Sequence, residues 1–215
     1  MNQVTRNQSI LSKYIPEPAV PVISEWIYHF NFKLKIKKSR STKYGDYRPP
    51  LPGTNHQITI NNDLNKYAFL ITLVHEIAHL LCWERHRNNV KPHGPEWKES
   101  FKELMRPMMR LQIFPDDVRT AIIGYMQDPG ASSCSDEQLT RVLRRYDEKT
   151  GVVLLEILPV HAVFIFGKNR RFVKGAKRRS RIACKELETG RDYLFSPLSE
   201  VIPAEMQPVV ARESV

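Results

Sequence analysis

The stretch His75-Glu76-Ile77-Ala78-His79 lies in a run of residues whose apolar side chains recur at helical spacing. This pattern extends from Leu64 to Leu81 and predicts a helix over about residues 63–84 that is buried on most of its faces. Polar residues at positions 61–63 precede it and offer N-cap side chains. We therefore expect the five-residue stretch to lie on a buried helix.

The two histidines in this stretch have the spacing of metal ligands on one helix. His75 and His79 are four residues apart, so both imidazoles lie on the same helix face and can reach one metal ion. Glu76 projects beside them, where it can take a proton from a water molecule bound to the metal. This combination of residue types and spacing is typical of zinc metalloproteases.

A catalytic zinc site usually has three protein ligands and one open position, so a third ligand should follow the helix. The metzincin spacing fails, because Cys82 and Arg85 occupy its glycine and histidine positions and His86 is one residue out of register. A glutamate from a following helix, Glu99 or Glu103, remains an alternative of the thermolysin type. The donors downstream of the stretch are Glu84, His86, His93, Glu96, Glu99 and Glu103.

His93 is the best placed of these donors. It precedes Gly94, which permits a tight turn, and Pro95, which suits the first position of a new helix. Such a turn would direct the His93 ring back toward the first helix. We expect the new helix to run from Pro95 to about Met105, with Trp97 packed against the helix that carries the other two histidines.

These two histidine-containing stretches, the second of which reads His93-Gly94-Pro95-Glu96-Trp97, resemble the SprT-like zinc metallopeptidases, the family that includes the Spartan DNA–protein crosslink protease. The sequence upstream is similar in its order, with residues 39–47, then residues 58–61, then a leucine-rich helix. The resemblance covers about residues 20–110. It implies a zincin-like minimal metalloprotease domain of the α+β class, in which helices accompany a small sheet.

The resemblance also implies the chemistry of the site. His75, His79 and His93 match the zinc ligands of the family, and Glu76 matches its catalytic base. One catalytic Zn2+ ion is implied. The resemblance further implies cleavage of proteins that are bound or crosslinked to DNA, with DNA as an activator.

The basic residues of the chain are clustered. There are 33 Lys and Arg residues against 23 Asp and Glu, which gives a formal net charge of +10. Between residues 168 and 191 the basic side chains are opposed only by Glu186 and Glu188. Such clustering is typical of proteins that bind a phosphate backbone, although a net positive charge can also serve solubility alone. The residues predicted to contact nucleic acid are Lys168, Arg170, Arg171, Lys174, Lys177, Arg178, Arg179 and Arg181.

A second basic cluster precedes the metal-binding stretch. Its lysines alternate with apolar residues in a strand predicted over residues 31–38, so they should share one face of that strand. A solvated face or the protection of an edge strand is the favoured interpretation of this cluster. It consists of Lys33, Lys35, Lys37, Lys38, Arg40 and Lys43.

We predict two domains, an SprT-like metalloprotease domain over residues 1–130 and a small, basic, β-rich C-terminal module over residues 131–215. Residues 129–133 are typical of a linker, and the first 15 residues are polar and expected to lack regular structure. Short β-branched and aromatic runs after Gly151 predict strands. Several SprT-like proteins carry a C-terminal zinc ribbon with two cysteine pairs. This chain has no C-x-x-C, so we expect the module to keep a hairpin layout without a second zinc.

Cysteine usage and hydropathy indicate the cellular setting. Cys82, Cys134 and Cys184 are far apart and odd in number, so a disulfide framework is not expected and a reducing cytoplasm, with or without association with the nucleoid, is the simplest location. No apolar run reaches the ~20 residues that span a bilayer. The N-terminus has no apolar signal region, so no membrane partner is expected.

The leading interpretation is a zinc-dependent endopeptidase that acts on proteins near nucleic acid, with Glu76 as the general base. Its expected partners are protein substrates and DNA, single-stranded DNA included. Tyr44, Tyr47 and Arg48 are candidates to line its cleft. Two alternatives stay open: a nucleic-acid-binding protein with a structural or inactive zinc site, and a cytosolic peptidase with an incidental basic surface.

Overall fold

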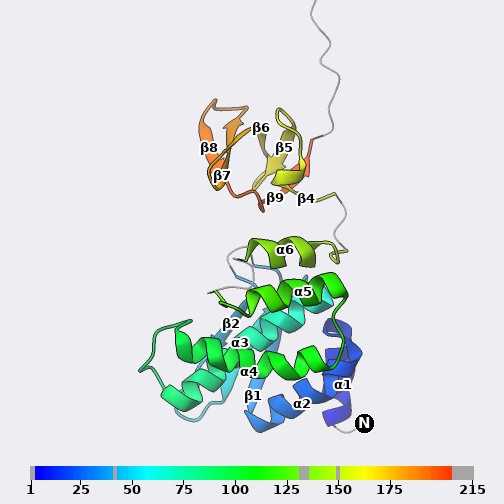
Figure 1. The fold of residues 1–215 in the computed structure, drawn as a ribbon, viewed down its shortest axis with the longest axis vertical. Coiled ribbons are helices and arrows are strands. Elements are labelled where there is room, and N and C mark those ends of the chain that lie inside the picture. Colours follow the sequence, from blue (N-terminus) through cyan, green and yellow to red (C-terminus); the bar gives the residue numbers. More distant parts are fainter. Residues whose placement is uncertain (1–2, 41–42, 131–135, 149–150, 205–215) are drawn as a thin grey trace, which may run out of the picture. The chain divides into compact units, whose positions relative to one another are not determined.

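The chain folds as two units, residues 1–147 and residues 148–215, each with its own internal contacts. Helices and a small sheet make up the first unit, and strands dominate the second, so the fold is α+β as predicted (Figure 1). Within the described residues, no helix is both long enough and apolar enough to cross a membrane. The residues that this computed structural model describes are 3–40, 43–130, 136–148 and 151–204.

The boundary between the units lies later than the division at residue 130 that the sequence suggested. Helix α6 (Glu137–Arg144) packs against helix α5 (Asp116–Tyr125) and buries Leu139 in the core of the N-terminal unit. The segment that follows the predicted linker therefore belongs to this unit by its contacts. Residues 131–133 of that linker lie outside the described part of the chain.

A three-stranded sheet forms one layer of the N-terminal unit, in the order β1-β3-β2. Strand β1 is parallel to β3, and β2 is antiparallel to it. Apolar side chains of β1 and β3 lie in the core, while Lys33, Lys35 and Lys37 alternate with them and are exposed. This alternation was predicted, and it places the lysines on one face of an edge strand. The strands are β1 (Phe32–Lys37), β2 (Gly45–Arg48) and β3 (His56–Asn61).

Helix α3 (Lys66–His86) is the central helix and packs against strands β2 and β3. Its residues 68–78 are all buried, which agrees with the dense apolar pattern. The cap differs from the prediction, because β3 continues through Asn61 and the helix begins only after Asn65. The Asn65 side chain accepts hydrogen bonds from the backbone N–H groups of Tyr67 and Ala68.

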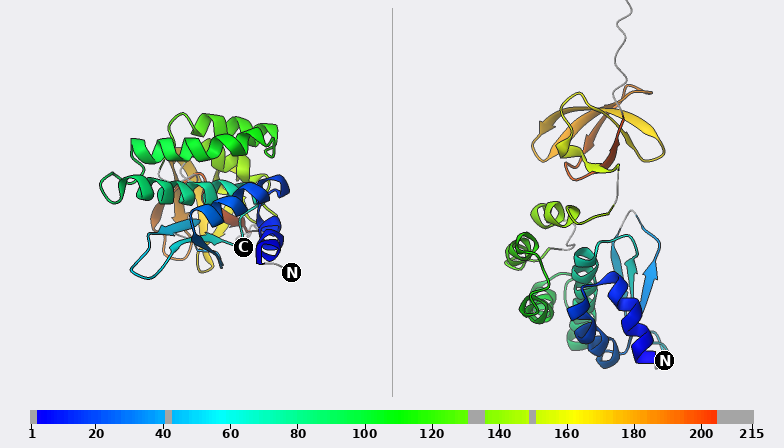
Figure 2. Two further views of the ribbon diagram at one scale, coloured as in Figure 1. Left: turned by 90° about the horizontal axis from the view of Figure 1, so that it is seen from below. Right: turned by 90° about the vertical axis from the view of Figure 1, so that its right-hand side faces the viewer.

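Helix α4 (Pro95–Arg110) packs along α3, as Figure 2 shows from the side. It begins at Pro95 as predicted but runs to Arg110, one turn beyond the predicted end. Pro107 lies inside this helix. Phe101 and Leu104 form a buried stripe that Met108 continues past the predicted end, so packing against α3 outweighs the proline.

The expectation that the first 15 residues lack regular structure is wrong. They form helix α1 (Gln3–Tyr14), which is followed by a short 3-10 helix, η1 (Glu17–Ala19), and by helix α2 (Val20–His29). Leu11 and Ile15 are buried in the core. Two apolar residues one turn apart suffice here because the neighbouring helices offer a surface on which to bury them.

The C-terminal unit is a six-stranded sheet in the order β4-β9-β5-β6-β7-β8, with neighbouring strands antiparallel. Phe164 and Phe172 stack with ring centroids 5.5 Å apart, and Phe195 meets both rings edge-on. These three aromatic side chains therefore fill a small core. The elements are β4 (Val153–Leu154), η2 (Leu155–Ile157), β5 (Val163–Phe166), β6 (Arg170–Arg178), β7 (Arg181–Glu186), β8 (Asp192–Phe195) and β9 (Glu200–Pro203).

Candidate metal centre

Three histidines from two elements converge at one point of the N-terminal unit. His75 and His79 lie on α3, and His93 lies in the loop before α4. The Nε2 atom of His75 lies 3.3 Å from the Nε2 atoms of both His79 and His93. Their ligand atoms all lie within 4.8 Å of one another. The structure thus brings together the three residues that the sequence singled out, and the group could hold a metal ion.

The turn before α4 positions His93. Its backbone has φ +57°, in the left-handed region, and the N–H of Gly94 donates to the carbonyl of Lys91 at 2.9 Å. The next helix then begins at Pro95. The chain therefore reverses immediately before α4, which directs the imidazole toward α3.

Trp97 forms a wall behind all three imidazoles. Its ring centroid lies 4.5 Å from that of His75, 5.3 Å from that of His79 and 4.7 Å from that of His93. The indole is only 1% exposed and stacks on Phe101. Trp97 is the packing residue that the sequence predicted, and it restricts the orientations that the histidine rings can adopt.

Three of the other candidate donors form side-chain pairs instead. Glu84 is hydrogen bonded to His56, Glu99 pairs with Arg106, and Glu103 forms a bidentate pair with Arg85. Among the described residues, the group that could hold a metal ion comprises the three histidines and no carboxylate. The thermolysin-type alternative, in which a glutamate of the following helix is the third ligand, does not match this arrangement.

The electrostatics of the site favour neutral imidazoles. Burial, with a further contribution from the neighbouring histidines, lowers the pKa of His75 to about 2 and that of His79 to about 3. Burial also lowers the pKa of His93. Neutral imidazole is the form that binds metal ions, so these three ligands need not lose a proton before coordination at neutral pH.

Glu76 lies next to the histidines under strand β2 and is 7% exposed. Burial, and the nearby carboxylate of Asp46, raise its pKa to about 8, while a hydrogen bond from the backbone N–H of Tyr47 acts in the opposite direction. A Cβ atom at Gly45 would lie 2.8 Å from the Cγ and 2.9 Å from the Cδ of Glu76. Only glycine at position 45 leaves room for this carboxylate, a requirement that the sequence pattern did not reveal.

The eight predicted nucleic-acid contacts all lie in the C-terminal unit, but in unlike environments. Lys174 is 6% exposed and donates to the backbone carbonyls of Glu156 and Leu158. Arg170 donates to Glu186 at 2.5 Å, and Arg171 pairs with Glu188 at 2.9 Å. Lys174 in particular is held inside the unit and is not placed to reach a phosphate. Lys174 shares one face of β6 with the buried Phe172, so strand alternation could have distinguished it from the exposed bases.

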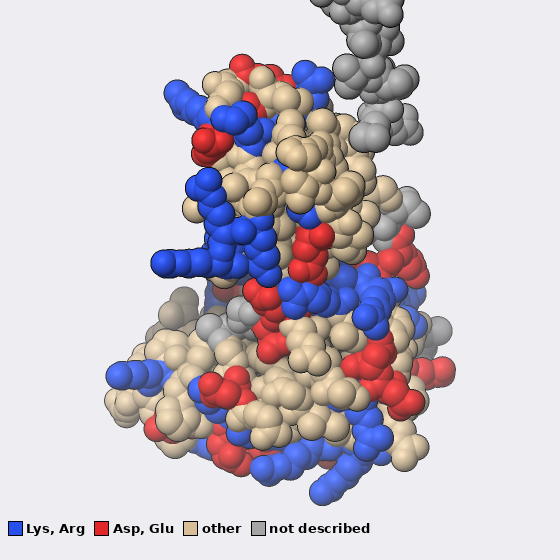
Figure 3. Space-filling view, turned by 45° about the horizontal axis from the view of Figure 1, so that its top comes forward, with Lys and Arg blue, Asp and Glu red and all other residues tan. Residues whose placement is uncertain are grey.

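The remaining basic residues lie on the surface. The end of the β6–β7 hairpin carries Lys177, Arg178, Arg179 and Arg181, and none of these four forms an ion pair with another described residue. We call these four residues the hairpin cluster. Lys168 lies in the turn before β6 and is exposed as well. Figure 3 shows Lys and Arg side chains gathered on one side of the C-terminal unit.

Comparison with known proteins identifies the family. The model of the SprT-like family matches residues 24–117, the segment that contains the three histidines and Glu76. Over 143 residues the chain is 30% identical to Protein SprT of Klebsiella pneumoniae (strain 342), covering 62% of this chain and 81% of that protein. Over 99 residues it is 35% identical to Protein SprT of Cronobacter sakazakii (strain ATCC BAA-894), covering 43% of this chain and 55% of that protein. No solved structure matches the chain. The chain belongs to the SprT-like family.

Proposed function

We propose that this protein is a zinc-dependent endopeptidase of the SprT-like type that acts on proteins bound or crosslinked to DNA. The observation that carries the proposal is the convergence of three neutral imidazoles beside one buried carboxylate. The packing of α3 against α4 and against a small sheet around these groups supports a zincin-like minimal domain. Membership of the SprT-like family supports the same reaction class.

The spacing of the imidazoles favours zinc. Tetrahedral coordination at a zinc–nitrogen distance of about 2.0–2.1 Å requires ligand nitrogens about 3.3 Å apart. Two of the three Nε2 pairs, His75–His79 and His75–His93, have this separation, 3.3 Å, and all the ligand atoms lie within 4.8 Å of one another. A structural zinc site is normally closed by a fourth protein ligand, whereas the described residues here provide three. This difference favours a catalytic ion over the alternative of a purely structural site.

The residues of the chain then have distinct roles. The three histidines would hold the zinc ion, whose Lewis acidity would activate water and polarise the scissile carbonyl. Glu76 takes the proton from the attacking water and delivers it to the leaving amine. The backbone N–H of Tyr47 fixes the orientation of this carboxylate.

We also propose that the C-terminal unit is a nucleic-acid-binding module that localises the peptidase on DNA. The hairpin cluster supplies four exposed cations at one end of β6, whereas the exposed Lys168 lies in the turn at the opposite end of that strand. Cations of this kind contact phosphates without reading the base sequence. Arg170, Arg171 and Lys174 contribute mainly to the structure of the unit.

The test is cleavage of a DNA-crosslinked model protein by the zinc-loaded protein, with and without single-stranded DNA, beside the variant Glu76→Gln. We expect cleavage that DNA stimulates and that the substitution abolishes while zinc content is retained. The matched control is Glu103→Gln, which removes a surface ion pair between the same two helices and should cleave normally. Absence of cleavage with zinc and DNA both bound would instead favour the binding-protein alternative.

A further inference from the structure

A chain of hydrogen bonds connects the edge of the metal centre to the last turns of α3. The hydroxyl group of Tyr47 on β2 lies 2.9 Å from Nδ1 of His56 on β3. Nε2 of His56 lies 2.8 Å from Oε1 of Glu84 on α3. His56 is 7% exposed and its ring meets the edge of Trp83 at 5.1 Å between centroids. Both ring nitrogens of a buried histidine are thus engaged by side chains from two other elements.

The chemistry of the three groups sets the direction of these hydrogen bonds. The Glu84 carboxylate only accepts, so Nε2 of His56 carries a proton, and in the neutral form of the ring Nδ1 is left as an acceptor. The hydroxyl of Tyr47 must then donate to Nδ1. The result is a single arrangement in which Glu84 fixes the ring of His56 and His56 fixes Tyr47.

Tyr47 touches both functional parts of the metal centre. Its ring lies parallel to that of His79, with an interplanar angle of 4° and centroids 6.5 Å apart. Its backbone N–H donates to the carboxylate of Glu76. The ring of a metal ligand and the carboxylate of the proposed base therefore share one neighbour, and this neighbour is held in place from its far end.

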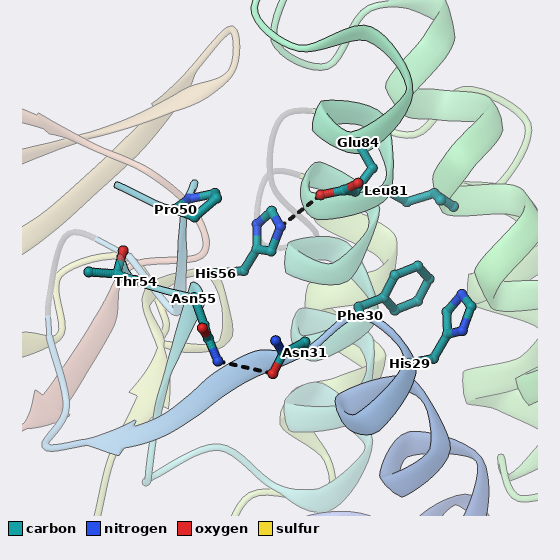
Figure 4. A pocket seen from close by; sticks show the side chains of 9 residues that line it. All are labelled: His29, Phe30, Asn31, Pro50, Thr54, Asn55, His56, Leu81 and Glu84. Carbon is teal, nitrogen blue, oxygen red and sulfur yellow. Dashed lines mark hydrogen bonds and ion pairs between the residues drawn. The ribbon is translucent and has the colours of Figure 1, made fainter. Parts of the chain in front are cut away.

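The outer end of the chain of hydrogen bonds opens onto solvent. His56 and Glu84 line a pocket of about 510 Å3. Figure 4 shows these two side chains facing each other, with Pro50 and Asn55 on one side and Phe30 and Leu81 on the other. The Glu84 side chain is 43% exposed there, whereas that of His56 is 9% exposed. If these hydrogen bonds served only to hold β3 against α3, the one between His56 and Glu84 would be sufficient. The chain of hydrogen bonds instead continues inward from His56 to Tyr47, which favours a role at the metal centre.

We propose that Tyr47 is a positioning residue, held by His56 and Glu84, whose ring orients the metal ligand His79 while its backbone N–H orients Glu76. The inference rests on the proposed function for its kinetic consequence but not for its effect on metal binding. Outer groups that orient metal ligands typically change metal affinity or activity by about 10–100-fold when they are removed. We expect an effect at the lower end of this range, because Tyr47 contacts His79 through its ring rather than through a hydrogen bond.

The experiment compares four variants of the full chain. Tyr47→Phe removes only the hydroxyl, and His56→Leu removes both hydrogen bonds at similar volume. In His56→Gln the amide can still donate to Glu84 and accept from Tyr47, so this variant should restore the arrangement. Glu103→Gln serves again as the control. The measurements are zinc affinity by competition with a chromophoric chelator, the visible spectrum of the Co2+-loaded protein, and kcat and KM on a protein substrate.

We expect Tyr47→Phe and His56→Leu to lose about tenfold in zinc affinity or in kcat, with KM unchanged and a shifted Co2+ spectrum. His56→Gln and Glu103→Gln should resemble the wild type. Wild-type affinity, spectrum and kcat in both Tyr47→Phe and His56→Leu would overturn the proposal, and so would an equal loss in His56→Gln and His56→Leu. If His56→Leu fails to fold, the zinc affinity, Co2+ spectrum and kcat of Tyr47→Phe alone test the proposal. If even the wild type cleaves nothing, the proposed function fails, while the affinity and the spectrum still decide the role of Tyr47.

Discussion

Two buried glutamates, one in each unit, have opposite acid–base properties. Glu76 is 7% exposed and Glu186 is 4% exposed. Burial and the carboxylate of Asp46 raise the pKa of Glu76 to about 8, whereas hydrogen bonds from Arg170 and Thr189 lower that of Glu186 to about 2. Both residues are buried to a similar extent, so burial alone does not explain the difference between their pKa values. The number of hydrogen-bond donors around each carboxyl group does. A buried carboxylate that is short of donors is suited to proton transfer, and one that is surrounded by donors holds a structure together.

The same contrast extends to the basic residues of the C-terminal unit. Lys174 has its donors occupied by backbone carbonyls, and Arg170 has its charge opposed by Glu186. The four side chains of the hairpin cluster form no ion pair with another described residue. Whether a charged side chain already has hydrogen-bond or ion-pair partners, rather than its residue type, therefore decides whether it remains available for substrate or nucleic acid.

Substitution of the two glutamates should have opposite consequences. Glu76→Gln removes the proposed base, so kcat should fall by about 10²–10⁴-fold while zinc stays bound. Glu186→Gln leaves the metal centre intact, so kcat should stay at the wild-type value while the C-terminal unit loses stability. The measurements are turnover of a protein substrate, zinc content and thermal unfolding. Comparable turnover in wild type and Glu76→Gln would refute the assigned role of Glu76.

Charge reversal of the hairpin cluster tests the second contrast. Each phosphate contact contributes about 0.7 to the slope of log affinity for single-stranded DNA against log salt. Replacing Lys177, Arg178, Arg179 and Arg181 by Glu should therefore flatten this slope by about 3 and weaken binding at low salt. Reversal of the exposed Lys33, Lys35 and Lys37 on β1 is the control, and we expect it to have a small effect. DNA affinity that the first reversal leaves untouched would exclude the hairpin cluster from the interface.

The sequence predicted the features that depend on local spacing. The i, i+4 histidines, the buried helix around them and the start of α4 at Pro95 follow from periodicity and from turn chemistry. The missed features depend on distant neighbours. Helix α1 is stable because Leu11 and Ile15 find a core built from other elements.

The environment of Glu76 shows the same limit within the candidate site. The residue pattern identifies Glu76 as a candidate base, but the pKa of its carboxyl group depends on burial under β2 and on Asp46. Likewise, Tyr47 could be suspected of lining the cleft, whereas its link to His56 and Glu84 joins segments 9 and 28 residues apart along the chain. Only the folded sheet brings these groups together.

Gly45 provides a sharper test of the space around Glu76. In Gly45→Ala the new Cβ would lie 2.8 Å from Cγ of Glu76, so the carboxylate or strand β2 must shift. We expect a loss of about 1–3 kcal/mol in the free energy of unfolding and at least a tenfold loss of kcat. Gly124→Ala in α5 is the matched control, because an added Cβ there meets nothing within 4 Å. Wild-type turnover in Gly45→Ala would show that the position of Glu76 is not tightly constrained.

The smallest expected effect is the pH dependence of the C-terminal unit. The pKa of Glu186 is about 2 in the folded state and about 4.3 in an unfolded chain, so its ionised form stabilises the fold above pH 4. This contribution is lost as the pH falls from about 4 toward 2. Hydrogen exchange of the β6 and β7 amides, corrected for the intrinsic rate, should therefore show protection declining over this range in the wild type and less steeply in Glu186→Gln. Glu188→Gln is the control, since the Glu188 side chain is 46% exposed and its pair with Arg171 is screened by water. Equal declines in wild type and Glu186→Gln would mean that the donors around Glu186 do not hold it ionised, and the contrast with Glu76 would lose its physical basis.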